Sequence, residues 1–285
     1  MIPAEFDYVR ATSVDDAVAA LAAHGEDAKV LAGGQSLLPL MRLRLAVPTA
    51  LVDVGRVDEL LGITDEGAEL RIGAATTHHD VLDSPLVAEH APLLVDVTTT
   101  VADPAVRHRG TLGGSLAHAD PAGDLPAAAL VLGATFEVAG PSGRRTVEAA
   151  EFFVDYLQSA MGEGDVLVAV RVPKLGAEWG HHYEKFHRVA QSWATVGVAA
   201  VVRRDDGAIA EARIGLTNMG PTPLRAAAAE QALAGVAASA DSVAVASAHA
   251  ADGASPPSDL AGQADYRHHL ATVLTRRAVV AAAGI

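Results

Sequence analysis

The sequence predicts an α+β protein that is organised around two glycine-centred segments. Three observations support this prediction. The first 55 residues combine one amphipathic helical pattern with short apolar strand patterns, and residues 56–176 continue to mix short helices with strands. Beyond residue 177, three strand patterns precede a group of helices. The segments 32–36 and 111–115 each place a Gly-Gly pair shortly before a serine.

The first unit contains a helix whose two ends are marked by capping residues. Ser13 is a favourable N-cap, acidic residues follow it in the first turn, and Gly25 is typical of a helix end. Short apolar runs at residues 29–32 and 49–54 predict two strands. We therefore predict a small unit of a helix and strands over residues 1–55.

The second unit is predicted to contain helices, strands and a hairpin over residues 56–176. Thr77 is a favourable cap for a helix that ends near Pro85, and Asp103-Pro104 is expected to break the helix before it. The predicted elements are strands at 70–73 and 166–172, helices at 77–85, 92–100 and 124–132, and a hairpin of 134–139 with 144–147.

The third unit, residues 177–285, is predicted to be an antiparallel sheet followed by helices. Asp205-Asp206-Gly207 has the composition of a tight turn between two strands. The predicted strands are 181–188, 195–203 and 208–217, and the predicted helices are 224–233, 241–251 and 266–283.

Composition limits the classes of function. The chain has 35 acidic and 21 basic residues and a net charge of -14, which argues against nucleic acid as a partner. No apolar run reaches the ~20 residues that span a bilayer, and the first ten residues lack the order of a signal peptide. A cytoplasmic location is therefore expected. Because the chain has no cysteine, disulfides, thiol catalysis and cysteine-ligated iron–sulfur clusters are excluded within it.

The two glycine segments predict a site for one diphosphate. Successive backbone N–H groups in a glycine loop can form a nest that holds phosphate oxygens, and glycine also permits positive φ. The alternative is that each segment is an ordinary tight turn. Gly33-Gly34 lacks the third spaced glycine of a Rossmann fingerprint, and neither segment has the Gly-Lys-Ser/Thr of a Walker A loop. A flavin site of another fold is the remaining interpretation.

Three further residues have two interpretations each. Asp124 caps the following helix, accepts a hydrogen bond from a ribityl hydroxyl, or does both. Trp193 is either a core residue or an aromatic cover for a flavin ring. Lys185 is either a solvated strand residue or a contact to phosphate or flavin.

No metal site is predicted on this chain. The histidines at 78–79, 181–182 and 268–269 are adjacent pairs, and adjacent side chains on a helix or strand point apart. None of them has the spacing of a helical zinc site.

The chain resembles the FAD-binding medium subunits of molybdenum hydroxylases, and within that family the medium subunits of aerobic carbon monoxide dehydrogenases. The resemblance runs nearly end to end. It is carried by motifs that include Leu31-Ala32-Gly33-Gly34-Gln35-Ser36-Leu37, Ala102-Asp103-Pro104, Gly110-Thr111-Leu112-Gly113-Gly114-Ser115, Asp124-Leu125-Pro126-Ala127, Tyr183-Glu184-Lys185 and Gly215-Leu216-Thr217-Asn218.

The resemblance implies a fold and a set of site residues. The fold would be a p-cresol methylhydroxylase-type FAD-binding domain of two α/β subdomains, residues 1–55 and 56–176. A C-terminal three-stranded antiparallel sheet with helices would follow, over residues 177–285. The implied FAD-binding residues are Lys29, Leu31, Ala32, Gly33, Gly34, Gln35, Ser36, Leu37, Val101, Thr111, Gly113, Gly114, Ser115, Asp124, Leu167, Lys185 and Trp193.

Two of these positions depart from the family pattern. Ser115 stands where an asparagine is common, and Trp193 stands where a well-known relative has tyrosine. Serine keeps a hydrogen-bonding group and tryptophan keeps an aromatic face, so both are compatible with FAD. A flavin reduction potential does not transfer with them.

The resemblance also implies a role. The chain would hold FAD noncovalently and carry no catalytic residue or metal of its own. Electrons would come from a molybdenum cofactor on a large partner subunit, through [2Fe–2S] clusters on a small one, and pass to an external acceptor. The assembly would be a dimer of heterotrimers in the cytoplasm, or peripheral to the inner face of the membrane. The alternatives are a medium subunit of a purine, aldehyde or N-heterocycle hydroxylase, a self-sufficient flavin oxidase, and a nucleotide-binding scaffold without redox chemistry.

Overall fold

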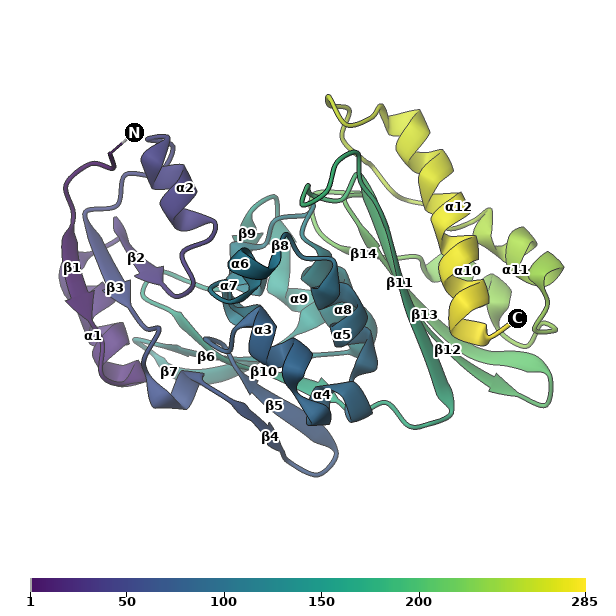
Figure 1. Cartoon of the computed structure of the whole chain (residues 1–285), viewed down its shortest axis with the longest axis horizontal. Helices are drawn as coiled ribbons and strands as arrows, with labels where there is room; N and C mark the ends of the chain where they lie inside the picture. The colour runs from purple at the N-terminus through teal and green to yellow at the C-terminus, as the bar shows by residue number, and fades with distance from the viewer. Residues whose placement is uncertain (1) are drawn as a thin grey trace.

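A computed structural model describes residues 2–285 and divides the strands among three main sheets (Figure 1). Strands from residues 7–53 form the first sheet, strands from residues 63–173 the second, and strands from residues 179–225 the third. The sheets follow one another along the long axis of the molecule, with the N-terminal sheet at the left of Figure 1 and the C-terminal sheet at the right.

The first sheet is parallel and has the order β1-β3-β2. Its strands are β1 (Asp7–Arg10), β2 (Ala28–Leu31) and β3 (Ala50–Asp53), and its helices are α1 (Val14–His24) and α2 (Leu37–Arg42). The Ser13 hydroxyl accepts from the Asp16 N–H, and Gly25 ends α1, which confirms the predicted caps. Strand β1 has no counterpart in the sequence prediction.

The second sheet has the order β4-β5-β10-β6-β7, with neighbours antiparallel. Its strands are β4 (Ile63–Asp65), β5 (Glu69–Gly73), β6 (Thr135–Gly140), β7 (Gly143–Glu148) and β10 (Val166–Pro173). The central strand β10 contributes side chains to two cores. Val166 and Val168 pack with α1, whereas Leu167 and Val170 join the core of the second unit, and a register shift between Leu167 and Ala169 interrupts the alternation.

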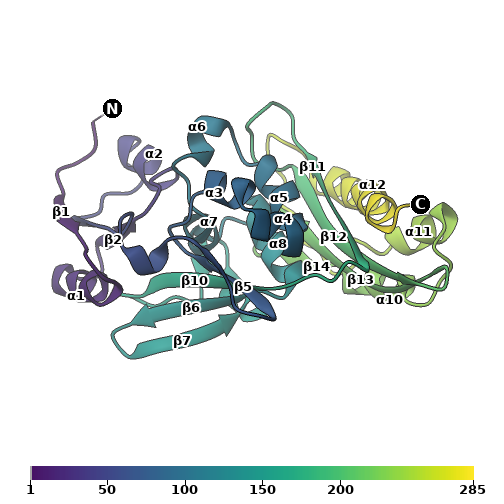
Figure 2. The ribbon, with the colours of Figure 1, turned by 60° about the horizontal axis from the view of Figure 1, so that its bottom comes forward.

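Helices cover one face of this sheet, as Figure 2 shows. They are α3 (His78–Asp83), α4 (Pro85–His90), α5 (Pro92–Thr99), α6 (Pro104–Arg107), α7 (Leu112–His118), α8 (Asp124–Leu132) and α9 (Ala149–Phe152). The 3-10 helix Asp58–Leu60 and the hairpin β8 (Phe153–Asp155) with β9 (Gln158–Ser159) complete the unit. Asp103-Pro104 follows the end of α5, as predicted, and it also begins a new helix, because the Asp103 carboxylate caps α6.

The third sheet is antiparallel and has the order β11-β12-β13-β14. Its strands are β11 (Trp179–Phe186), β12 (Val196–Asp205), β13 (Ala208–Thr217) and β14 (Leu224–Arg225), and its helices are α10 (Ala227–Leu233), α11 (Ala240–Ser247) and α12 (Ala264–Ala283). The three long strands and the helices agree with the sequence prediction. The two-residue strand β14 occupies the start of a segment that was predicted to be helical.

Helix α8 lies between the second and third sheets. Ala127 and Val131 of α8 share a core with Ala199 and Val201 of β12. Gly215 of β13 approaches α8 so closely that a Cβ atom there would be 2.7 Å from the Ala127 carbonyl oxygen. The second unit and the C-terminal sheet are therefore packed through one continuous core.

None of the helices in residues 2–285 combines the length and the apolar character needed to cross a membrane. The longest of them, α12, has 20 residues. Arg267, Arg276 and Arg277 all lie within it.

Candidate cofactor-binding site

The structure packs Gly33 of the first glycine segment against Arg109 and Gly110, which directly precede the second segment. A Cβ atom at Gly33 would overlap the backbone carbonyl group of Arg109 and would lie 2.8 Å from the Cα of Gly110. The first segment thus packs against the residues that lead into the second one. This contact joins the first sheet to the helices of the second unit.

The first segment presents a run of unused backbone donors between β2 and α2. Gly34 has a φ of 71°, which lies in the left-handed region that favours glycine. Among residues 2–285, the N–H groups of Gly33, Gly34, Gln35 and Ser36 have no hydrogen-bond acceptor. Such a run of free donors is the arrangement that binds anionic oxygens.

The second segment differs from the predicted phosphate-binding loop. Gly113 and Gly114 lie in the first turn of α7, and neither has a positive φ. The N–H of Gly113 donates to the Ala74 carbonyl at 2.9 Å, and the N–H of Gly114 donates to the Thr111 hydroxyl at 3.0 Å. The sequence prediction of a second nest is therefore wrong, since Thr111 caps a helix here with the Gly114 N–H and the Gly113 N–H is paired with Ala74.

Gly113 has a packing role. A Cβ atom at this position would lie 2.5 Å from the Cβ of Ala74, at the point where β5 leaves the sheet. The glycine therefore allows the start of α7 to sit directly on the edge of the second sheet.

A buried cluster of three polar side chains joins α8 to β11. The Asp124 carboxylate accepts from the Tyr183 hydroxyl at 2.6 Å and from the Lys185 ammonium at 2.7 Å. The side chains of Lys185 and Asp124 are only 4% and 5% exposed. Burial raises the pKa of the Asp124 carboxyl, and the Lys185 charge and both donors oppose that rise. The interpretation of Asp124 as a helix cap is wrong, because Gly123 is the N-cap and the carboxylate faces β11.

Lys185 connects this cluster to the end of α5. Its ammonium also donates to the Thr100 carbonyl at 3.1 Å, next to the half-buried Val101. The interpretation of Lys185 as a solvated residue is therefore wrong. Asp124, Val101 and Lys185, which lie far apart in sequence, are brought together at one place.

Trp193 lies on the segment between β11 and β12 and is 56% exposed. It is not a core residue, so that interpretation is wrong. The end of its segment is fixed by two side chains to which sequence reasoning gave no role. Asn218 donates to the Ala194 carbonyl at 2.8 Å, and the fully buried Arg267 donates to the Thr195 carbonyl.

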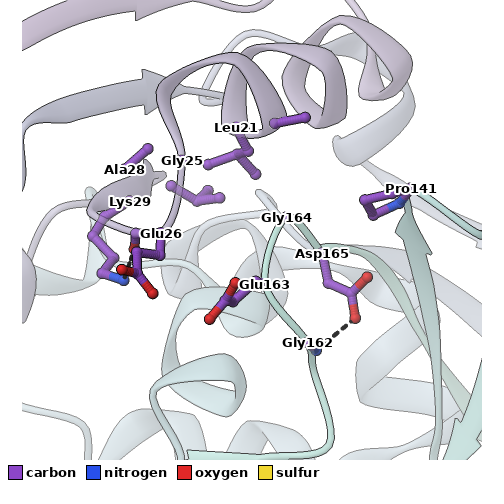
Figure 3. Close-up of a pocket in the computed structure, with 12 residues that line it drawn as sticks. Leu21, Gly25, Glu26, Ala28, Lys29, Pro141, Gly162, Glu163, Gly164 and Asp165 are labelled. Atoms are coloured by element: carbon purple, nitrogen blue, oxygen red, sulfur yellow. Dashed lines mark hydrogen bonds between the residues drawn. The ribbon is translucent and has the colours of Figure 1, made fainter.

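A pocket of about 350 Å³ lies between the first unit and the loop before β10 (Figure 3). Lys29 and Glu26 line one side, and Glu163, Gly164 and Asp165 line the other. The Lys29 ammonium donates to the Glu26 carbonyl at 2.9 Å, within the same unit. Lys29 is the member of the implied site that reaches this pocket.

The remaining candidates have structural settings of their own. Leu167 is 6% exposed and belongs to the core of the second unit. The three adjacent histidine pairs do not gather, and residues 2–285 contain no group of three or more potential metal-ligating side chains. His181 instead pairs with Asp96 of α5 at 2.7 Å.

Comparison with known families accounts for both halves of the chain. Residues 4–175 match the family model described as the FAD binding domain in molybdopterin dehydrogenase. The chain belongs to this family. Residues 181–282 match a second model, the CO dehydrogenase flavoprotein C-terminal domain. The first model ends shortly before β11, and the second begins within that strand.

Relatives in the molybdopterin dehydrogenase family extend over the whole chain. It is 43% identical to the carbon monoxide dehydrogenase medium chain of Hydrogenophaga pseudoflava, with 99% of this chain and 98% of that one covered. It is 37% identical to the nicotine 6-hydroxylase medium subunit of Paenarthrobacter nicotinovorans, with 96% of each covered. The solved carbon monoxide dehydrogenase of H. pseudoflava that lacks the Mo-pyranopterin moiety matches with a TM-score of 0.96 and 46% identity, over 99% of this chain and 98% of that one.

The residues present fit the FAD of this family. The free N–H groups of the first segment match the anionic oxygens of a pyrophosphate. The Asp124 carboxylate is a ready acceptor for a hydroxyl group, and the exposed indole of Trp193 offers an apolar face. Tyr183, Asn218 and Arg267 support these groups. All three lie in segments that carry the family resemblance, including Tyr266-Arg267, and this was the available signal for them.

Proposed function

We propose that this chain is the FAD-carrying electron-transfer subunit of a molybdenum- and iron–sulfur-containing dehydrogenase. The observation that supports this most directly is the run of four backbone donors in the first glycine segment that have no acceptor among residues 2–285, in a segment packed against the residues that precede the second one. Membership of the FAD-binding family and the buried Asp124–Lys185 pair support the same proposal. Electrons would enter from a partner subunit and leave to an external acceptor.

Each part of the site has a proposed task. FAD, when bound, supplies a centre that exchanges electrons singly or in pairs. The backbone of Gly33 to Ser36 binds the pyrophosphate, and Asp124 accepts a hydrogen bond from the ribityl chain. Lys185 holds Asp124 and closes the site against the end of α5. Trp193 covers the isoalloxazine ring and excludes water from it.

The other residues that the resemblance implies are proposed to line the same cofactor. Lys29 and the pocket at residues 162–165 lie on the proposed adenosine side. Leu31, Ala32 and Leu37 flank the first segment. Thr111 and Ser115 offer hydroxyl groups at the start of α7, with Gly113 and Gly114 between them. Val101 and Leu167 supply apolar contacts.

The proposed partner subunits are inferred from the absence of cysteine in this chain and from the names of its relatives. With no cysteine, this chain cannot ligate [2Fe–2S] clusters through thiolates, so we place them on a small partner subunit. The molybdenum cofactor belongs on a large one. We propose a dimer of heterotrimers in the cytoplasm, with peripheral association at the inner face of the membrane as the alternative.

Carbon monoxide is the proposed substrate of the complex, because the relative named for that enzyme is more similar than the one named for nicotine hydroxylation. An N-heterocycle is the second candidate, since the nicotine enzyme's subunit still matches over 96% of its length. Purification of the complex, metal analysis and turnover with carbon monoxide and with nicotine distinguish the two.

A test of the cofactor needs only the chain itself. Because no cysteine is present for a thioether link, acid precipitation should leave yellow flavin in the supernatant. Colour in the pellet would contradict noncovalent binding, and a colourless protein would favour a nucleotide-binding scaffold. Oxidation of a small organic substrate by the purified chain alone would favour a self-sufficient oxidase.

A further inference from the structure

The phenol of Tyr183 is a buried polar group with one specific partner. Tyr183 lies on β11 and is 6% exposed, and its hydroxyl donates to Oδ1 of Asp124 at 2.6 Å. Burial and the adjacent Asp124 carboxylate raise the pKa of Tyr183 well above its ordinary value. The hydroxyl therefore remains a donor throughout the physiological range.

The neighbouring strand makes room for this phenol. Gly197 of β12 lies opposite Lys185 in the strand register. A Cβ atom at Gly197 would overlap the Tyr183 hydroxyl and would lie 3.1 Å from the Cβ of Thr217. The residues on either side of Gly197 in β12, Val196 and Val198, both carry side chains. The glycine thus provides the space that the hydroxyl occupies.

Tyr183 and Lys185 donate to different oxygens of the Asp124 carboxylate. Tyr183 donates to Oδ1, and Lys185 donates to Oδ2 at 2.7 Å while also donating to the Thr100 carbonyl. With one donor on each oxygen, the carboxylate cannot rotate without losing a hydrogen bond in a buried site, which is costly. Each oxygen keeps a further lone pair for another donor.

We infer that Tyr183 is a positioning residue that fixes the Asp124 carboxylate in the orientation that accepts a hydroxyl group of the ribityl chain of FAD. This inference rests on the proposed function and deepens it. Tyr183 acts through Asp124 and does not itself contact the cofactor. Gly197 contributes to the same positioning, because its lack of a side chain accommodates the phenol.

The test compares Tyr183→Phe with the matched control Tyr8→Phe in the deflavinated full-length chain. Tyr8 also donates to an aspartate, Asp53, at 2.5 Å, but it lies on β1 and is exposed. We expect Tyr183→Phe to weaken FAD binding, measured by calorimetry, by about tenfold or more, as for loss of a hydrogen bond to a charged group. Tyr8→Phe should leave the FAD affinity unchanged.

A double-mutant cycle shows whether Tyr183 acts through Asp124. In an Asp124→Ala background, which has no side-chain acceptor for the phenol, Tyr183→Phe should cause little further loss of FAD affinity. An equal further loss there would overturn the inference, as would a wild-type affinity in the single variant Tyr183→Phe. Thermal melting of each deflavinated variant reports folding separately. Gly197→Ala provides a second perturbation, because it displaces the phenol without removing the hydroxyl, and it should also weaken binding.

FAD binding by the wild-type chain and by Tyr183→Phe tests the proposed function and this inference separately. If the wild-type chain binds no FAD, the proposed function is overturned and this inference with it. If the wild-type chain binds FAD and Tyr183→Phe binds it equally well, only the inference is overturned.

Discussion

Single residues in this chain show how burial decides between two interpretations of one amino acid. Trp193 is exposed, while the other tryptophan, Trp179, lies half-buried at the start of β11 with the Arg213 guanidinium 4.7 Å from its ring centre. The chain has only these two tryptophans, so each serves as a control for the other.

We expect Trp193→Ala to change the flavin more than the fold. Loss of an exposed side chain should alter the free energy of unfolding by no more than about 0.5 kcal/mol. If the indole covers the isoalloxazine ring, its removal should raise flavin fluorescence and shift the reduction potential. Trp179→Ala should lower the melting temperature and leave the flavin spectrum unchanged. An unchanged flavin in Trp193→Ala would contradict the stacking role.

His78 makes stability depend on pH. Burial, with a smaller contribution from the Arg107 charge, lowers the pKa of His78 to about 4 from its ordinary value of 6.5. Between these values the unfolded chain binds a proton that the folded chain does not, so folding stability falls as pH falls from 6.5 to 4. The expected loss from this group is about 3 kcal/mol at most.

Urea unfolding of the deflavinated chain at several pH values measures this effect. His78→Gln should flatten the dependence of the unfolding free energy on pH between 4 and 6.5. The same substitution at the exposed His269 should leave the slope unchanged. Parallel slopes for His78→Gln and the wild type would show that another group is responsible.

At the scale of elements, the two glycine segments have different roles despite similar sequences. The first is a loop with free donors, and the second is a capped helix start. Thr111 is a favourable N-cap, but the Gly-Gly pair that follows it is also typical of a nest. The sequence alone does not distinguish these two structures. This difference changes what substitutions at the glycines should do.

Gly33→Ala should separate the first unit from the second. The added methyl group meets the backbone of Arg109 and Gly110, which cannot rotate away as a side chain can. We expect a loss of about 1–3 kcal/mol of stability, typical of overpacking, together with loss of FAD. Gly67→Ala is the control, because its φ of 84° strains alanine but no atom lies within 4 Å. It should cost stability and keep FAD. Full FAD content in Gly33→Ala would contradict the predicted coupling.

Gly114→Val should act through the helix cap. A Cβ atom there would lie 2.7 Å from the Thr111 hydroxyl, so the substitution displaces the N-cap and does not oppose a positive φ. We expect a loss of about 1 kcal/mol from the cap and a weaker, not abolished, affinity for FAD. Calorimetric titration of FAD into this variant and into Thr111→Ala should give similar affinities. Complete loss in one and not in the other would contradict this account.

Capping residues and apolar patterns predicted the helices and strands whose ends or faces they determine. Helix α1 was predicted because Ser13 and Gly25 fix its ends within the sequence itself. Strand β1 was missed because most of its residues are exposed and show no apolar alternation. The partner of Tyr183 lies 59 residues away, so only the fold reveals the bond to Asp124. Nothing in the sequence placed Trp193 at the surface. The backbone of the next two residues is held by Asn218 and Arg267, which are distant in sequence.

For the whole molecule, the division into 1–55, 56–176 and 177–285 stays a prediction. The core of the second unit continues across residue 176 through α8 and β12. We therefore expect a chain that ends at residue 176 to expose the apolar side of α8 and to lack a cooperative melting transition. Calorimetry of the truncated and full-length chains tests this. A sharp transition and bound FAD in the truncated chain would show that the first 176 residues fold alone.

The exchange rate of the amide protons in the first glycine segment should report whether FAD is bound. In the deflavinated chain, the amides of Gly33 to Ser36 have no acceptor within residues 2–285 to delay their exchange with deuterated water, whereas those of Gly113 and Gly114 are already bonded. A bound pyrophosphate would slow exchange in the first segment and change little in the second. Mass spectra of peptides from the two segments would then read cofactor occupancy directly, even in crude mixtures where colour is hidden.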